Sequence, residues 1–456
     1  MDLKLLPTDE ELVKDDSSFF PNIIKGEYPD VSAYLDIHYS LLREDFIRPL
    51  REALAAFKKN PGKKVENLAI FPSIRFKQIQ KVSHEIGIEV QFTENDCEDE
   101  DWENSKSLLK GSLLLFTSDN FQSHMLGTVL QREIMQLKRG VVTVRIHRES
   151  PFLLEFTAPF LMAECDTFFL PYCNVMNVLG SLQENTFPFR SEIVYAHKDS
   201  FAPEYLHDLT EYSLPNGKSV TLLQMRTAVK PEELALNESQ FSAVVTALQR
   251  RIALVQGPPG TGKTYVGSKI AEILLKNDHV WNVNNDSPLL IVCASNQALD
   301  QFAERLLPFT EDIIRIGEQS KSKLLENFNL NVIQRRNKLA DFDKSQQTQE
   351  MKTRYKNMMV SWDNLEKIVE RINRIRDDGG DVVHLIPSLR KLETDYNGAV
   401  ELFKKEQQKT LEHILRKAKV LAMTTTRAAS MHDILKKVKP PIGKDKNVNV
   451  SSLFKI

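Results

Sequence analysis

The chain has 456 residues, 41% of them hydrophobic and 27% charged, and a formal net charge of −2. This length can hold several domains, and the near-neutral charge excludes a uniformly basic nucleic-acid-coating protein. Any nucleic-acid site must therefore be a local groove. No apolar leader and no run of the ~20 apolar residues that a spanning helix needs is found, so we expect an intracellular protein without a membrane segment.

The N-terminal half contains two kinds of periodicity. Residues 1–30 carry turn formers and are expected to be extended. Residues 31–60 repeat apolar side chains at three- and four-residue steps, which predicts a helix that Pro49 kinks or restarts. Residues 61–235 contain runs in which polar and apolar residues alternate, notably Ile86–Phe92 and the stretch that follows Val141. Such alternation predicts half-buried strands in a small sheet or barrel, followed by a connector.

Residues 236–319 alternate helical patterns with short apolar runs. The runs Ile252–Val255, Leu289–Cys293 and Asp312–Ile316 are each expected to form a strand. Strands that alternate with amphipathic helices are typical of a parallel sheet with helices on its faces.

The C-terminal third is predicted to leave this sheet and return to it. Residues 320–418 are polar and poor in glycine, which indicates a long helical insert that breaks near residues 376–380. The sheet is expected to resume within residues 419–439. Residues 440–456, rich in proline, lysine and asparagine, are expected to be disordered.

The strongest motif is Gly-Pro-Pro-Gly-Thr-Gly-Lys-Thr at residues 257–264. Its glycines allow a tight turn that aims backbone N–H groups at phosphate oxygens, and the following helix presents its positive end to the same anion. Lys263 would place a charge on the β- and γ-phosphates, and Thr264 would offer a hydroxyl to Mg²⁺. The predicted nucleoside-triphosphate site comprises Gly257, Pro258, Pro259, Gly260, Thr261, Gly262, Lys263 and Thr264.

Gln240 has two compatible interpretations. Asn237 is suited to cap the next helix, and Gln240, three residues later, would complete a capping box. Its place shortly before the P-loop also suggests an amide that recognises adenine.

Short polar residues follow two predicted strands. Ser295 and Asn296 either cap the next helix or face single-stranded nucleic acid. Thr424 and Thr425 could also face nucleic acid, although threonines are also good strand formers. The candidate nucleic-acid contacts are Ser295, Asn296, Ala298, Arg315, Thr424 and Thr425. The basic residues Arg315, Lys321, Lys323, Arg335, Arg336 and Lys338 either line a phosphate groove or form a solvated helix face.

Several segments resemble one family. In order, Leu236–Gln240, Gly257–Thr264, Ser295–Asp300, Arg315–Gly317 and Met423–Thr426 resemble the first motifs of the up-frameshift-like superfamily 1 helicases. Further segments resemble the NFX-type zinc-finger RNA helicases, namely Pro21–Gly26, Tyr34–Arg51 and Gly111–Phe121.

This resemblance implies an α/β protein with an incomplete RecA-like parallel sheet, a barrel-like accessory domain and a helical insert. It implies that the protein uses ATP with Mg²⁺ and binds single-stranded RNA, in small-RNA silencing, heterochromatin or antiviral pathways. The implied partners are RNA-silencing proteins such as an RNA-directed RNA polymerase complex or Argonaute. The implied location is the cytoplasm, a ribonucleoprotein granule or the nucleus.

The sequence departs from the family pattern after residue 439. The family continues to an apolar strand that ends in an acidic pair, whereas residues 440–446 contain neither. The arginines of a second motor domain are also expected to be missing, and an arginine finger alone contributes roughly 10³–10⁵ in rate. We therefore expect this chain alone to bind nucleotide without hydrolysing it. The sequence supports two readings, the N-terminal portion of an RNA helicase or a non-hydrolysing adaptor from a truncated gene product.

Overall fold

The computed structural model divides the chain into two compact units, one comprising Met1–Lys25 and Ser32–Leu182, the other Gly26–Val31 and Gln183–Ile456. The structure describes residues 5–13, 20–61, 63–93, 101–147, 159–197, 202–203, 206, 210–282, 287–317, 319–340, 346–438 and 454–455.

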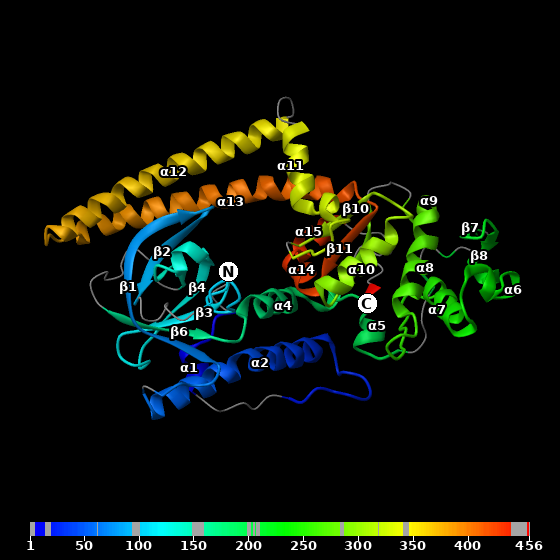
Figure 1. Cartoon of the computed structure of the whole chain (residues 1–456), viewed down its shortest axis with the longest axis horizontal. Coiled ribbons are helices and arrows are strands. Elements are labelled where there is room, and N and C mark those ends of the chain that lie inside the picture. The colour runs from blue at the N-terminus through cyan, green and yellow to red at the C-terminus, as the bar shows by residue number, and fades with distance from the viewer. Residues whose placement is uncertain are drawn as a thin grey trace. The chain divides into compact units, whose positions relative to one another are not determined.

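The first unit is built on a closed barrel of strands in the order β1-β2-β5-β4-β3-β6, with every neighbouring pair antiparallel (Figure 1). The barrel is thus confirmed, and the two alternating runs form β2 and β5. Its strands are β1 (Leu68–Val82), β2 (Glu85–Phe92), β3 (Leu113–Thr117), β4 (Met125–Gln131), β5 (Val141–His147) and β6 (Phe160–Cys165).

Strand alternation fills the barrel with apolar side chains. Ile88, Val90 and Phe92 are all buried on one face of β2, as period-two alternation requires. The rings of Phe76 and Phe116 lie 5.5 Å apart in the same core. A side-chain-filled interior is the usual state of a small barrel.

Helices pack on the outside of this barrel. The long helix α2 (Val31–Lys59) buries Phe46 against Phe169 of α4 (Phe169–Ser181), with ring centroids 4.7 Å apart. Pro49 lies inside α2 without dividing it, so the predicted restart does not occur. A short helix, α1 (Asp9–Val13), lies where an extended segment was expected. The unit also contains α3 (Ile134–Leu137).

The second unit contains a parallel sheet in the order β10-β11-β9-β12. Its strands are β9 (Leu289–Cys293), β10 (Ile313–Ile316), β11 (Val420–Thr424) and β12 (Phe454–Lys455). The predictions of strands at residues 289–293 and 312–316 are thereby confirmed to within a residue, and the sheet resumes with β11 inside the predicted range 419–439. β12 falls inside the segment expected to be disordered, and the rest of residues 440–456 lies outside the described residues.

Both faces of this sheet are covered, because successive strand residues contribute to two different cores. Ile291, Ile313 and Ala422 join the core formed with α7 (Glu238–Gln249), α8 (Lys263–Lys276) and α10 (Asn296–Leu306). Leu290 and Leu421 join the opposite core, formed with α11 (Leu330–Ala340), the end of α13 (Ile386–Arg416) and α15 (His432–Val438). Apolar residues at consecutive strand positions are the signature of such a doubly covered sheet.

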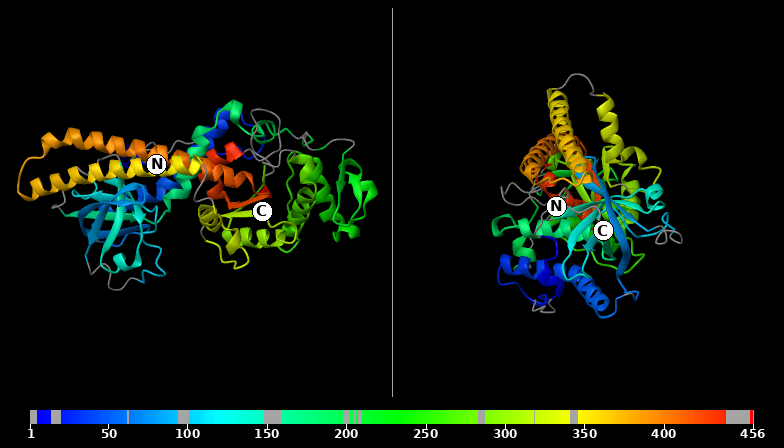
Figure 2. Two further views of the ribbon diagram at one scale, coloured as in Figure 1. Left: turned by 90° about the horizontal axis from the view of Figure 1, so that it is seen from above. Right: turned by 90° about the vertical axis from the view of Figure 1, so that its left-hand side faces the viewer.

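The predicted helical insert is a long antiparallel pair of helices, α12 (Gln346–Asp377) and α13, which lie side by side in both figures of the ribbon (Figures 1 and 2). Trp362 and Tyr396 pack between them at a ring distance of 5.4 Å. The break falls at the predicted place. After β11 the chain forms two short helices, α14 (Thr425–Ser430) and α15.

One predicted strand is wrong. Residues 252–255 have no strand assignment, and Leu254 is 94% exposed. A short apolar run forms a strand only when a neighbouring backbone pairs with it, and residues 252–255 pair with none of the strands that the structure describes. The remaining elements of this unit are η4 (Glu184–Thr186), α5 (Arg190–Ile193), β7 (Glu211–Ser213), β8 (Ser219–Thr221), η5 (Leu222–Gln224), α6 (Met225–Ala228), η6 (Pro231–Leu234), α9 (Asp278–Trp281), η7 (Glu326–Phe328) and η8 (Val383–Leu385).

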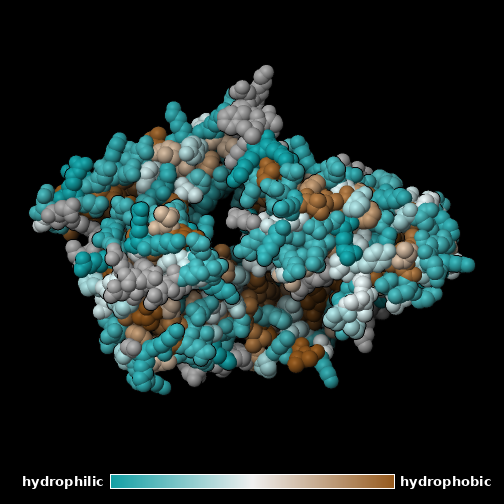
Figure 3. Space-filling model, in the orientation of Figure 1, coloured by the Kyte–Doolittle hydropathy of each residue, from teal (hydrophilic) through white to brown (hydrophobic). Residues whose placement is uncertain are grey.

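The exposed surface is mainly hydrophilic on the face that Figure 3 shows. Among the residues that the structure describes, no helix has the length and apolar character needed to cross a membrane.

Candidate nucleotide and nucleic-acid site

The P-loop turns immediately before α8. Gly260 and Gly262 have φ values of 83° and 87°, a region that other residues rarely adopt, and Gly262 is the N-cap of α8. A Cβ at Gly262 would lie 2.8 Å from the Gln240 side-chain nitrogen. No side chain caps α8, so its first-turn N–H groups remain available to an anion. The loop therefore fits a phosphate group.

Lys263 is folded back on the same loop. Its Nζ donates to the carbonyl oxygens of Gly257 and Pro258 at 2.6 and 2.9 Å. The Thr261 hydroxyl donates to the Pro258 carbonyl at 2.9 Å. A triphosphate would compete with these carbonyls for the ammonium group. Thr264 follows at the first turn of α8, where its half-buried hydroxyl can serve a cation beside the phosphates.

Gln240 connects the N-terminus of α7 to the P-loop. Its backbone N–H donates to Asn237 Oδ1 at 2.9 Å, and its own Oε1 accepts from the Asn237 backbone at 3.1 Å, which confirms the predicted capping box. The side-chain nitrogen donates to the Thr261 carbonyl at 3.1 Å. Adenine recognition by Gln240 stays a prediction, and an adenine would have to share this amide with both contacts.

The carboxyl ends of the parallel strands bring the predicted nucleic-acid residues together. Cys293 and Thr424 are partners in the β9–β11 register, so the residues that follow them start from neighbouring points of one edge. Ser295 caps α10 by accepting from the Ala298 N–H at 3.2 Å, and Thr424 caps α14 in the same way at 3.3 Å. The capping interpretation is confirmed for Ser295, and the cap formed by Thr424 was not predicted. Ser295 is exposed and Asn296, Thr424 and Thr425 are half-buried, so solvent reaches this edge.

Arg315 does not line an exposed groove. Its side chain is fully buried on β10. The guanidinium donates to Asp300, Asn296 and the Gly317 carbonyl. A direct contact with RNA would require some of these bonds to break. Lys321, Lys323, Arg335 and Arg336 are exposed, whereas the side chain of Lys338 lies outside the described residues.

Asp300 is not among the predicted site residues, yet it joins Arg315 to the loop that follows β10. A signal was present in the spacing, because Asn296, Asp300 and Glu304 recur at four-residue steps beside the apolar face of α10.

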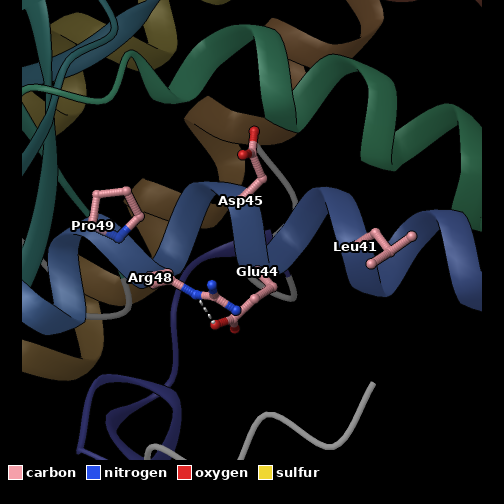
Figure 4. A pocket seen from close by; sticks show the side chains of 5 residues that line it. All are labelled: Leu41, Glu44, Asp45, Arg48 and Pro49. Atoms are coloured by element: carbon pink, nitrogen blue, oxygen red, sulfur yellow. Dashed lines mark hydrogen bonds and ion pairs between the residues drawn. The ribbon is translucent and has the colours of Figure 1, made fainter. Parts of the chain in front are cut away.

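A surface pocket elsewhere has no part in this site. About 240 Å³ of space lies against α2, lined by Leu41, Glu44, Asp45, Arg48 and Pro49 (Figure 4). The pocket belongs to the first unit, whereas the P-loop belongs to the second, and it contains neither a phosphate-binding loop nor a helix N-terminus.

Two domain families match the chain. Residues 63–166 match the ZNFX1 domain, a range that contains the barrel strands, and residues 235–442 match an AAA domain, a range that contains the P-loop and the carboxyl edge of the sheet. A human protein, NFX1-type zinc finger-containing protein 1, is 36% identical over 359 residues, which cover 72% of this chain and 19% of the relative.

The chain belongs to the superfamily 1 helicases, in the NFX-type group. A second relative in this group, the helicase required for RNAi-mediated heterochromatin assembly 1 of Schizosaccharomyces pombe, is 30% identical over 326 residues, covering 70% of this chain and 32% of that protein. A putative regulator of nonsense transcripts 1 from Takifugu rubripes is 36% identical over 89 residues. The chain spans about a fifth of the human relative and about a third of the fission-yeast one.

Proposed function

We propose that this chain is the nucleotide-binding portion of an ATP-dependent RNA helicase. The observation that carries this proposal is one arrangement within the second unit: a glycine-turned P-loop at the N-terminus of α8, and polar helix caps at the carboxyl ends of β9 and β11. Ligands of open α/β sheets bind outside the carboxyl ends of the strands.

ATP would be held by the backbone of residues 257–262. Lys263 would leave the two loop carbonyls and contact the β- and γ-phosphates, and Thr264 would contribute its hydroxyl to Mg²⁺, which neutralises charge on the phosphates. Gln240 would meet the adenine ring while it holds the loop through Thr261.

Single-stranded RNA would lie along the carboxyl edge of the sheet. Ser295 and Asn296 stand at the N-terminus of α10, and Thr424 and Thr425 stand at that of α14. Helix N-termini and short polar side chains are suited to contact a nucleic-acid backbone without reading its bases. The Ala298 N–H would take part in RNA binding indirectly, because it holds the Ser295 hydroxyl in place.

The name of the fission-yeast relative refers to RNAi-mediated heterochromatin assembly. We propose by analogy that this chain acts on RNA in a silencing pathway. RNA-silencing proteins are the corresponding partners.

A non-hydrolysing adaptor is the second candidate. It is favoured by residues 252–255, which lead into the P-loop and pair with none of the described strands, because a loop that no strand anchors holds phosphates less rigidly. The adaptor would bind nucleotide and RNA without coupling them to turnover.

Titration with a fluorescent ATP analogue and Mg²⁺ tests the nucleotide site. Lys263→Ala should weaken binding by roughly 10- to 100-fold, because a charged hydrogen bond to phosphate is lost. Lys276→Ala, at the other end of α8, is the matched control and should leave the affinity unchanged. Equal affinities of wild type and Lys263→Ala would contradict the proposed site.

RNA-stimulated ATP turnover by the same chain separates the two candidates. Turnover that Lys263→Ala abolishes supports the helicase. Binding of both ligands with no turnover supports the adaptor.

A further inference from the structure

Three polar residues form a stripe along α10 beside its apolar face. Asn296, Asp300 and Glu304 lie at four-residue intervals and so share one face. Leu299, Phe302, Ala303 and Leu306 fill the core beside them. Asp300 is only 7% exposed, and burial of a carboxylate is costly unless it is paired and hydrogen-bonded.

Arg315 supplies that pairing from β10. Its Nε lies 3.1 Å from Asp300 Oδ1, its Nη2 lies 2.9 Å from Asn296 Oδ1, and its Nη1 donates to the Gly317 carbonyl. Each guanidinium nitrogen therefore has an acceptor. A Cβ at Gly317, where φ is 138°, would lie 2.8 Å from Arg315 Nη1, so the chain passes close enough to require glycine.

The same stripe holds the loop that follows β10. Asp300 Oδ2 accepts from the Ser320 hydroxyl at 3.0 Å and from the Lys321 backbone N–H at 3.1 Å. Above and below, Asn296 donates to the Gln319 side chain, and Glu304 accepts from the Ser322 hydroxyl. Residues 319–322 are thus tied to α10 at successive turns.

This loop presents cations at the edge proposed for RNA. Lys321 and Lys323 are exposed, and neither forms an ion pair within the part of the chain that the structure describes. The N-terminus of the same helix carries Ser295 and Asn296. One buried ion pair therefore fixes two parts of the edge relative to one another.

We propose that Arg315 and Asp300 are positioning residues for RNA binding, and that Lys321 and Lys323 make the phosphate contacts. This inference rests on the proposed RNA site. Buried ion pairs contribute little net stability, and specification of one conformation is their better-supported use. A guanidinium with three protein acceptors is suited to this structural task rather than to a mobile phosphate.

Asp300→Asn distinguishes positioning from direct contact by the sign of its effect. If Arg315 contacts phosphate, the loss of its counter-charge frees the guanidinium and removes a negative charge, so RNA binds more tightly. If the pair positions the loop, the amide has only one acceptor oxygen and cannot accept from both Arg315 and the loop residues Ser320 and Lys321, so RNA binds roughly 10-fold more weakly. The measurement is the Kd of a labelled oligouridine for the whole 456-residue chain.

Two further variants guard against a folding defect. Ser320→Ala removes one loop bond and leaves the buried pair intact, and should weaken RNA binding in the same direction. Asp278→Asn breaks a 2.7 Å pair with Lys419, which immediately precedes β11 at the opposite end of the strand, and removes the same charge. It should not weaken RNA binding. Affinity for the fluorescent ATP analogue should stay unchanged in all three variants.

The outcomes are separable. Tighter RNA binding or no change in Asp300→Asn overturns the inference while the proposed function stands. Equal losses of RNA and nucleotide affinity indicate a purely structural pair and also overturn it. No RNA binding by the wild type overturns the proposed function and this inference together. Lys321→Gln should lower the slope of log K against log salt concentration by about 0.7, and an unchanged slope excludes that phosphate contact.

Discussion

The barrel and the parallel sheet bury similar apolar side chains, but the barrel is closed and the sheet is open. The barrel closes on itself, so each of its strands has a partner on both sides. The parallel sheet is open, with all its strands pointing the same way and polar residues collected at their carboxyl ends. Closure leaves no strand of the barrel unpaired, whereas the carboxyl ends of the sheet present the N-termini of α10 and α14 to a ligand.

Buried polar groups show the same division of roles. In the barrel, Glu164 accepts from the Leu108 N–H and the Ser107 hydroxyl, both at 2.7 Å, and so holds a loop against β6. In the sheet, Arg315 and Asp300 hold a loop at the proposed RNA edge. Both buried carboxylates hold a loop by hydrogen bonds. Their position in the fold decides whether that loop belongs to the barrel or to the proposed RNA site.

The largest expected effect is a loss of barrel stability in Phe116→Ala. Phe116 is fully buried and packs on Phe76, so its truncation should cost about 3–5 kcal/mol of unfolding free energy. Hydrogen exchange of peptides from β1 to β6 measures this loss. Because the P-loop lies in the other unit, nucleotide affinity should not change.

Phe309→Ala is the control for this substitution, since that ring is 40% exposed in the second unit. A cost of less than about 1 kcal/mol in Phe116→Ala would contradict a barrel stabilised by its interior packing. A parallel loss of nucleotide binding would show that the two units depend on one another.

A smaller effect is expected at the start of α7. Asn237→Ala removes a helix cap and should cost about 1 kcal/mol locally. In contrast to the barrel substitution, it should also weaken nucleotide binding. The Gln240 backbone N–H loses its acceptor, Asn237 Oδ1, so the first turn of α7 frays and the Gln240 side chain holds Thr261 less firmly. Hydrogen exchange of α7 and nucleotide titration report the two effects.

Asn237→Ser keeps a capping oxygen and should restore most of both properties. If serine behaves as poorly as alanine, the cap is not the link between α7 and the P-loop.

The smallest expected effect is a pH dependence from the barrel. Burial raises the pKa of Glu164 above its ordinary value, despite hydrogen bonds that act in the opposite direction. The folded state therefore favours the protonated carboxyl, and its stability is greatest below the ordinary glutamate pKa and falls as pH rises through the raised one. Glu164→Gln should flatten this fall at pH values above the ordinary glutamate pKa.

Denaturant unfolding of the barrel at several pH values tests this expectation. Glu103→Gln, which changes a 66% exposed carboxyl of the same unit, should leave the pH dependence as it is. A steeper fall in Glu164→Gln than in the wild type would reverse the sign and refute the assignment.

Local patterns predicted most elements correctly. The alternation in residues 86–92 became β2, the apolar run at 289–293 became β9, and Asn237 with Gln240 formed the predicted cap. Each depends on side chains that are close in sequence. The run at residues 252–255 failed, because strand formation needs a partner that no local pattern can supply.

The sequence by itself determined the P-loop, because its chemistry depends on glycines and a lysine that are consecutive along the chain. It also determined the family, through motifs whose order can be read directly. Only the tertiary structure decided the place of Arg315, since its burial depends on Asp300 and on a loop that meet through the packing of α10 on the sheet. The sequence does not show whether a charged residue faces solvent or a buried carboxylate, and only the fold distinguishes the two.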